Sequence, residues 1–188
     1  MLGFLKRAIE SSSHKKTLRQ SIEAYERQQA AYLTMTKEEL ALLPEDALFS
    51  AAFARIFHIV DSFEDPAAGI RSLSVPAKAF YVTVQYEAEV YNGGLCQFFS
   101  NSSRLVAPEL SACLAEIGAD AHKKLYDAFL LANGIDVHDL SSFDAENVSE
   151  YLAQEQRYDF STFNQRFNEM KPVQEYLTPY IKAHIQDF

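Results

Sequence analysis

Apolar residues recur at every third or fourth position along most of this chain. This is the period of an α-helix that buries one face, so the pattern predicts a series of amphipathic helices. Shorter helical pieces are expected within residues 136–168. The main helices are expected over about residues 15–33, 44–63, 76–91, 108–118, 119–132 and 172–188. No segment shows the alternation of apolar and polar residues that is typical of a half-buried strand. The pattern predicts an all-α fold: a single compact multi-helix domain with an additional N-terminal helix.

The first expected helix carries an apolar row, formed by Leu18, Ile22, Tyr25 and Tyr32. Its other face holds basic and amide side chains, so we expect that face to lie in solvent or to dock on the acidic remainder of the chain. Just after this helix, residues 36–39 have the Thr-x-x-Glu spacing of a capping box, which predicts a new helix start.

The helical pattern is interrupted by a glycine pair inside the stretch Glu87–Asn101, which reads EAEVYNGGLCQFFSN. Asn92-Gly93-Gly94 favours a left-handed exit from a helix, because residues that carry a Cβ resist that conformation. The apolar residues that follow, Leu95, Phe98 and Phe99, are expected to be buried. We call Glu87–Asn101 the corner, and we interpret it as a structural feature of the fold.

The corner is the one stretch of the sequence whose residue types, two carboxylates and several amides, are typical of an active site. Glu87 and Glu89 are two residues apart on a helix, so they point to different faces and are poorly placed to act as an acid–base pair. We expect Glu89 to accept hydrogen bonds from the backbone amides of Gly93 and Gly94. The alternative is a small-ligand-binding site or enzyme active site around Glu89, Asn92, Gln97 and Asn101.

The charge of the chain is unevenly distributed. Residues 1–37 carry a net charge of +4, whereas residues 38–188 carry −13. We therefore divide the chain into a basic N-terminal helical segment, 1–37, and an acidic all-helical domain, 38–188. A domain that acidic repels nucleic acids and membrane surfaces and attracts proteins with basic sites. Direct nucleic-acid binding and membrane binding are not expected.

The chain lacks the motifs that are typical of several classes of enzyme and ligand-binding protein. The chain contains no Gly-rich dinucleotide or phosphate-binding motif, no Gly-x-Ser-x-Gly and no His-Glu-x-x-His, and its histidines do not occur at metal-ligand spacing. Cys96 and Cys113 are too far apart for a Cys-x-x-Cys motif and lie among apolar residues, so each is expected to be a reduced core residue. No cofactor and no metal are expected. A signal peptide and a long apolar run are also absent, which favours a cytoplasmic location.

The second half of the corner resembles a family signature. Residues 89–101 are similar to the pattern E-V-x-N-G-G-x-x-Q-F-F-x-N of a bacterial DNA-mimic protein family. The resembling residues are Glu89, Asn92, Gly93, Gly94, Gln97, Phe98, Phe99 and Asn101. The resemblance covers about residues 38–186. It implies an all-helical fold and, for the protein that gives the family its name, a non-enzymatic role in which carboxylates stand where DNA has phosphates.

The segment 136–159, which we call the acidic segment, is the expected place for such mimicry. It contains a single basic residue, Arg157, and the carboxylates of Asp136, Asp139, Asp144, Glu146, Glu150, Glu155 and Asp159. Glu146 and Glu150 are four residues apart, which on one helix separates them by about 6 Å along the axis, close to the spacing of phosphates on one DNA strand. The alternative interpretation is an ordinary solvated helix face.

These observations lead to one functional hypothesis and two alternatives. The hypothesis is an acidic, non-enzymatic protein-binding domain whose partner is a DNA-binding protein such as a transcription factor. The first alternative is the small-ligand site or enzyme at the corner. The second is a purely structural role, in which the aromatic-rich faces form a homodimer.

Overall fold

The structure is a computed structural model that describes the backbone of residues 2–188 and the side chains from residue 17 onward. Within these residues all of the regular secondary structure is helical and there is no β-strand, so the predicted all-α class is confirmed. The α-helices are α1 (Leu2–Thr34), α2 (Lys37–Ala41), α3 (Glu45–Asp61), α4 (Pro66–Ser72), α5 (Val75–Ser100), α6 (Ala107–Glu116), α7 (Asp120–Asn133), α8 (Val148–Arg157), α9 (Phe160–Asn168) and α10 (Gln174–Ala183). The 3₁₀ turns are η1 (Ser102–Val106), η2 (Ser141–Phe143) and η3 (Ile185–Asp187).

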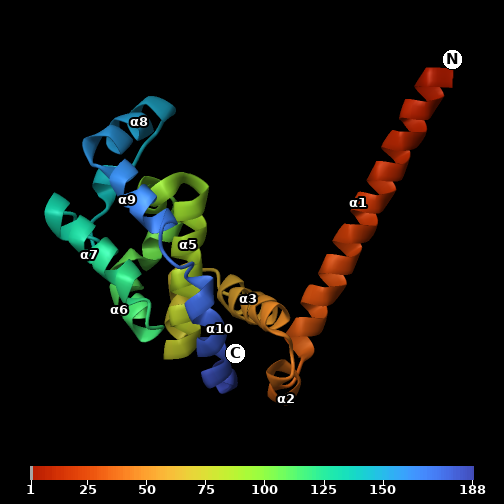
Figure 1. Cartoon of the computed structure of the whole chain (residues 1–188), viewed down its shortest axis with the longest axis horizontal. Coiled ribbons are helices and arrows are strands. Elements are labelled where there is room, and N and C mark those ends of the chain that lie inside the picture. Colours follow the sequence, from red (N-terminus) through yellow and green to blue (C-terminus); the bar gives the residue numbers. More distant parts are fainter. Residues whose placement is uncertain (1) are drawn as a thin grey trace.

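Helix α5 is the centre of the fold. It contacts α3, α4, α6, α8, α9 and α10, and Figure 1 shows it surrounded by the other helices of the body. This central place follows from its composition, because most of its residues are apolar and few positions carry charge. A helix that is apolar on most of its circumference must be covered on several sides. Phe80, Tyr86, Phe98 and Phe99 of α5 are fully buried.

Helix α1 extends away from the body, as Figure 1 shows, and only its C-terminal end is anchored. There, Tyr32 is buried, and the Arg55 guanidinium of α3 donates to the Tyr32 and Met35 carbonyl oxygens at 3.3 and 2.7 Å. Of the two arrangements expected for the polar face of this helix, the side chains that the structure describes, from residue 17 onward, show the solvent-facing one. The predicted apolar row is not a core face, because Leu18, Ile22 and Tyr25 are between 48% and 62% exposed.

Helices α2 and α3 agree with the sequence pattern at their starts. The predicted capping box is present: the Thr36 hydroxyl accepts from the Glu39 amide, and the Glu39 carboxylate accepts from the Thr36 amide. It starts the short helix α2, and α3 then begins directly after Pro44. Among the described residues, no helix combines the length and apolar character that crossing a membrane requires.

One buried ionisable side chain ties α7 to the segment before α10. His122 is fully buried and its Nε2 lies 2.8 Å from the Lys171 carbonyl oxygen, so Nε2 carries the proton and donates. Its Nδ1 is buried without a hydrogen-bond partner. Burial lowers the pKa of His122 below the usual value of 6.5, because a charged imidazolium here would lose its hydration.

We therefore expect the free energy of unfolding to decrease as the pH falls below about 6.5. The unfolded chain takes up the His122 proton at 6.5, whereas the folded chain does so only at a lower pH, so added protons favour unfolding. Urea unfolding at a series of pH values measures this dependence. In His122→Phe the dependence between pH 6.5 and 5 should be clearly weaker. Equal pH dependence in the two proteins would contradict this explanation.

Candidate functional site

The corner is a kink within α5 and not the end of a helix, which corrects the sequence prediction. The backbone leaves the helical region at Gly93 (φ −154°, ψ 17°) and Gly94 (φ +82°, ψ 178°), and the helix then continues to Ser100. Gly94 has the positive φ expected for this glycine pair, but its ψ of 178° places it in the extended region that is essentially restricted to glycine, and not in the left-handed helical region. The helix resumes because Leu95, Phe98 and Phe99 all have a buried place to occupy beyond the kink.

An asparagine from α9 fills the kink. The Asn164 Oδ1 accepts a hydrogen bond of 3.0 Å from the Leu95 amide, which the break in α5 leaves without a helical partner. A Cβ atom on Gly94 would lie 2.2 Å from Asn164 Nδ2, so only glycine permits this approach. Sequence reasoning missed Asn164. Its only signal is a polar residue beside Phe163 and close to Phe167, both of which are buried.

Glu89 is the point on which the other polar side chains of the corner converge. Its Oε2 accepts from Gln97 Nε2 at 2.8 Å and from Asn101 Nδ2 at 2.9 Å, and its Oε1 accepts from Ser103 Oγ at 2.9 Å. The prediction that the Gly93 and Gly94 backbone amides donate to Glu89 is therefore wrong. The kink turns the second part of α5 so that its side chains, rather than its backbone, reach the carboxylate.

The remaining polar residues of the corner lie apart from Glu89. Asn92 is exposed and makes no side-chain hydrogen bond within the described part of the chain, so the structure does not bring it into a site with Gln97 and Asn101. Glu87 faces α10, where its Oε1 accepts from the Val173 amide at 2.6 Å. Burial raises the pKa of Glu87, against the opposing effect of its backbone hydrogen bonds. Glu87 and Glu89 thus face different neighbours, as their spacing predicts.

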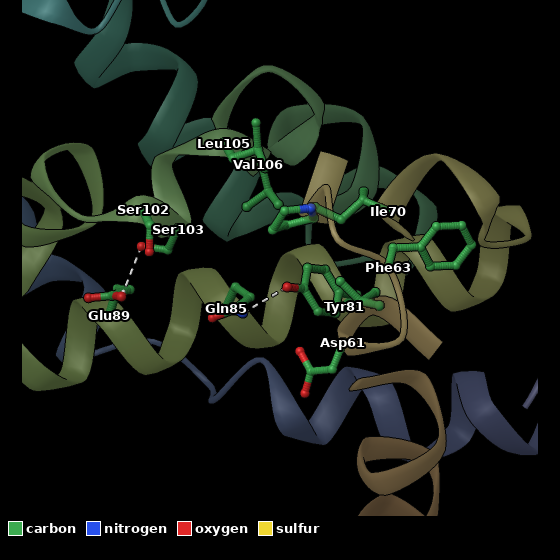
Figure 2. Close-up of a pocket in the computed structure, with 12 residues that line it drawn as sticks. Asp61, Phe63, Ile70, Tyr81, Gln85, Glu89, Ser102, Ser103, Leu105 and Val106 are labelled. Carbon is green, nitrogen blue, oxygen red and sulfur yellow. Dashed lines mark hydrogen bonds between the residues drawn. The ribbon is translucent and has the colours of Figure 1, made fainter. Parts of the chain in front are cut away.

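A cavity of about 360 Å³ lies on the outer side of Glu89. Figure 2 shows Glu89 and Ser103 at one end of it, Phe63 and Ile70 at the other, and Gln85 with Tyr81 between them. The Gln85 Nε2 donates to the Tyr81 hydroxyl oxygen at 3.1 Å. The cavity thus combines one carboxylate with fixed partners and a largely apolar far end. Sequence reasoning missed all of its residues except Glu89, because they come from α3, α4, α5 and η1.

All seven carboxylates of the acidic segment are exposed. Five of them also have a local structural role. The Asp136 and Asp139 carboxylates accept from backbone amides in turns, Asp144 pairs with Arg104 at 2.6 Å, and Glu150 and Asp159 accept from amides at the starts of α8 and α9. The other two, Glu146 and Glu155, make no side-chain hydrogen bond or ion pair among the residues that the structure describes.

Glu146 and Glu150 do not lie on one helix, so the phosphate-like spacing predicted for them is wrong. Helix α8 begins at Val148, so Glu146 precedes it. The Glu150 carboxylate turns back toward the helix start, where it accepts from the Glu146 amide at 2.8 Å. Its other oxygen, Oε1, accepts from the Asn147 side-chain amide at 2.8 Å, so two donors just before the helix hold the carboxylate in this inward position.

The two cysteines are both in the core, away from solvent. Cys96 and Cys113 are both buried and free, as expected. Burial raises the pKa of the Cys113 thiol to about 12 and also raises that of Cys96, so neither is an activated thiolate. No group of His, Cys, Asp and Glu side chains in the described part of the chain has the arrangement of a metal site.

Comparison with known proteins identifies the family. The family model described as "DMP19-like protein" matches residues 71–184, a range that contains both the corner and the acidic segment. The match begins near the end of α4, at residue 71, whereas the resemblance was expected to begin at about residue 38. No curated protein and no solved structure gave a significant match. The chain belongs to the DMP19-like family, the DNA-mimic family that the signature in the corner indicates.

Proposed function

We propose that the protein is a non-enzymatic DNA mimic whose acidic segment occupies the DNA-binding surface of a DNA-binding protein, such as a transcription factor. The observation that carries the proposal is the exposure of seven carboxylates within 24 residues of a chain that belongs to a DNA-mimic family. Only Arg157 opposes them in that segment, and its guanidinium lies over the Tyr158 ring, 5.4 Å from the centroid.

Local hydrogen bonds hold many of these carboxylates in place. A carboxylate that accepts from a helix or turn amide keeps its position while it still presents an oxygen edge to solvent. A partner evolved to bind the fixed phosphates of DNA is best matched by negative charges that are fixed in advance. The hydrogen bonds from backbone amides to Asp139, Glu150 and Asp159 therefore support the proposal as well as the fold.

The position of the acidic segment also favours this function. Figure 1 shows α8 at one end of the body, with α2 at the opposite end and α1 projecting from it. Among the side chains that the structure describes in α1, Arg19 and Arg27 are matched in number by Glu23 and Glu26, so this part of the helix has no net positive charge that could neutralise α8. Salt screens charges over about 10 Å at an ionic strength of 0.1 M, so the field around α8 is set mainly by the charges close to it.

Charge reversal tests the proposal. Glu146→Lys/Glu155→Lys should weaken binding to the DNA-binding partner at least about tenfold at low salt, because two attractive contacts become repulsive. Among the described residues neither side chain makes a hydrogen bond or an ion pair, and both are exposed, so the melting temperature should hardly change. Glu150 and Asp159 are left intact, since losing a helix cap costs about 1 kcal/mol and would confuse the result.

The matched control is Glu26→Lys/Glu64→Lys, which produces the same change in net charge at exposed positions on α1 and before α4. It should leave the affinity nearly unchanged. If the two double variants weaken binding equally, net charge rather than the acidic segment is responsible, and the proposed location is wrong.

A further inference from the structure

We propose that the cavity beside Glu89 binds a small organic cation, a primary amine attached to an apolar body. None of the residues that line this cavity belongs to the acidic segment. The cavity, about 360 Å³ in volume, lies in the range of pockets that hold small molecules. It is formed where the C-terminal end of α3, α4 and η1 meet the side of α5, as Figure 2 shows.

The charge of the cavity selects for a cation. Asp61 and Glu89 both line it, and no lysine, arginine or histidine does. Neither carboxylate forms an ion pair within the described residues. Carboxylates in a cleft with apolar walls focus a negative potential into it, which repels anions and attracts cations. A metal ion is a poorer candidate, because the described residues contain no cluster of three metal-binding side chains.

The orientation of Glu89 favours an ammonium group at that end. Three neutral donors, from Gln97, Asn101 and Ser103, hold the carboxylate in one position. They occupy Oε2 twice but Oε1 only once, and a carboxylate oxygen accepts two hydrogen bonds. Oε1 therefore has one remaining acceptor position, on the oxygen that bonds Ser103 at the cavity wall (Figure 2). A charged donor is the strongest partner for it.

The opposite end of the cavity requires an apolar group. Phe63 and Ile70 lie there, and Val60, Leu105 and Val106 add further apolar surface. Phe63 is 41% exposed and Leu105 is 47% exposed, so a ligand body would cover apolar area that is now in contact with water. The Tyr81 hydroxyl, which accepts from Gln85, keeps its own proton free for a polar substituent between the two ends.

The test uses three probes of the same shape and different charge: 2-phenylethylamine, 2-phenylethanol and phenylacetate. Titrations followed by NMR on the full chain should show binding of the amine, with shifts at the Gln85 side-chain amide and the Ser103 backbone amide. The neutral alcohol should bind about tenfold more weakly, because it lacks the charge-assisted hydrogen bond. Phenylacetate should not bind.

Two variants separate a specific site from general attraction to an acidic protein. Asp61→Asn removes a pocket charge at an exposed position without a side-chain hydrogen bond and should weaken amine binding several-fold. Glu64→Gln removes the charge of a residue that does not line the cavity, and it should leave the affinity for the amine unchanged. Equal binding of amine and alcohol, equal weakening by the two variants, or the absence of shifts at Gln85 and Ser103 would overturn the proposal.

Discussion

Replacing Gly94 by alanine is expected to lower the free energy of unfolding by about 2 to 4 kcal/mol. A residue with a Cβ at φ +82° costs about 1 to 2 kcal/mol. The new Cβ would also lie 2.2 Å from Asn164 Nδ2, so Asn164 must move and its bond to the Leu95 amide must lengthen or break. An unsatisfied buried amide costs a further 1 to 3 kcal/mol or so. Urea unfolding measures the sum.

Gly118→Ala is the matched control for the Gly94 prediction. Gly118 also has a positive φ, of +75°, but no atom lies within 4 Å of the position that its Cβ would occupy. The free energy of unfolding of Gly118→Ala should therefore fall only by the conformational cost of a Cβ at positive φ, about 1 to 2 kcal/mol. If both glycine variants lose the same stability, Asn164 does not occupy the kink as described, and the structural interpretation of the corner fails.

Replacing Phe99 by alanine is expected to cost about 3 to 5 kcal/mol, the usual loss for a large aromatic side chain in a core. Phe99 is fully buried, and its ring lies 5.0 Å from that of Phe143 and 6.4 Å from those of Tyr126 and Phe160. It thereby joins the corner to η2, α7 and α9. Leu131→Ala is the control, because Leu131 is 86% exposed and its loss should change the stability by less than about 0.5 kcal/mol.

The Phe99 variant also connects the corner to the proposed function. Phe143 lies within the acidic segment and Phe160 directly follows it, so Phe99 supports the scaffold that positions the carboxylates. Where Phe99→Ala remains folded at low temperature, amide exchange should increase first in residues 141–160. An equal increase in amide exchange across the whole chain would show that Phe99 does not support this segment in particular.

The features that sequence reasoning predicted correctly are local ones. The helical period, the capping box at Thr36 and Glu39, the burial of Phe98 and Phe99 and the positive φ at the glycine pair of the corner each depend on residues a few positions apart. The signature in the corner is also local, and it was enough to indicate the family.

The features that sequence reasoning missed depend on contacts between distant residues. The bond from Leu95 to Asn164 joins positions 69 apart, and the partners of Glu89 become clear only when α5 is known to kink and continue. The apolar row of α1 is only partly buried, at Tyr32, for a related reason. Periodicity shows that a helix has an apolar face, but it does not show whether another element covers that face.

The acidic segment illustrates the same limit in another way. Counting its carboxylates required only the sequence, but the sequence pattern placed Glu146 on a helix that in fact begins at Val148. The structure further separates carboxylates that hold turns and caps from Glu146 and Glu155, which have no such role. That separation is what makes a charge-reversal experiment possible without damage to the fold.

Displacement of DNA is the most direct test of the central claim. A DNA-binding protein captured from the native cell would be bound to labelled duplex DNA, and the full chain added while fluorescence anisotropy is recorded. DNA mimicry predicts that the chain releases the DNA, that release weakens steeply as salt rises, and that Glu146→Lys/Glu155→Lys releases little. A ternary complex that retains the DNA, or release unaffected by both salt and charge reversal, would contradict the claim.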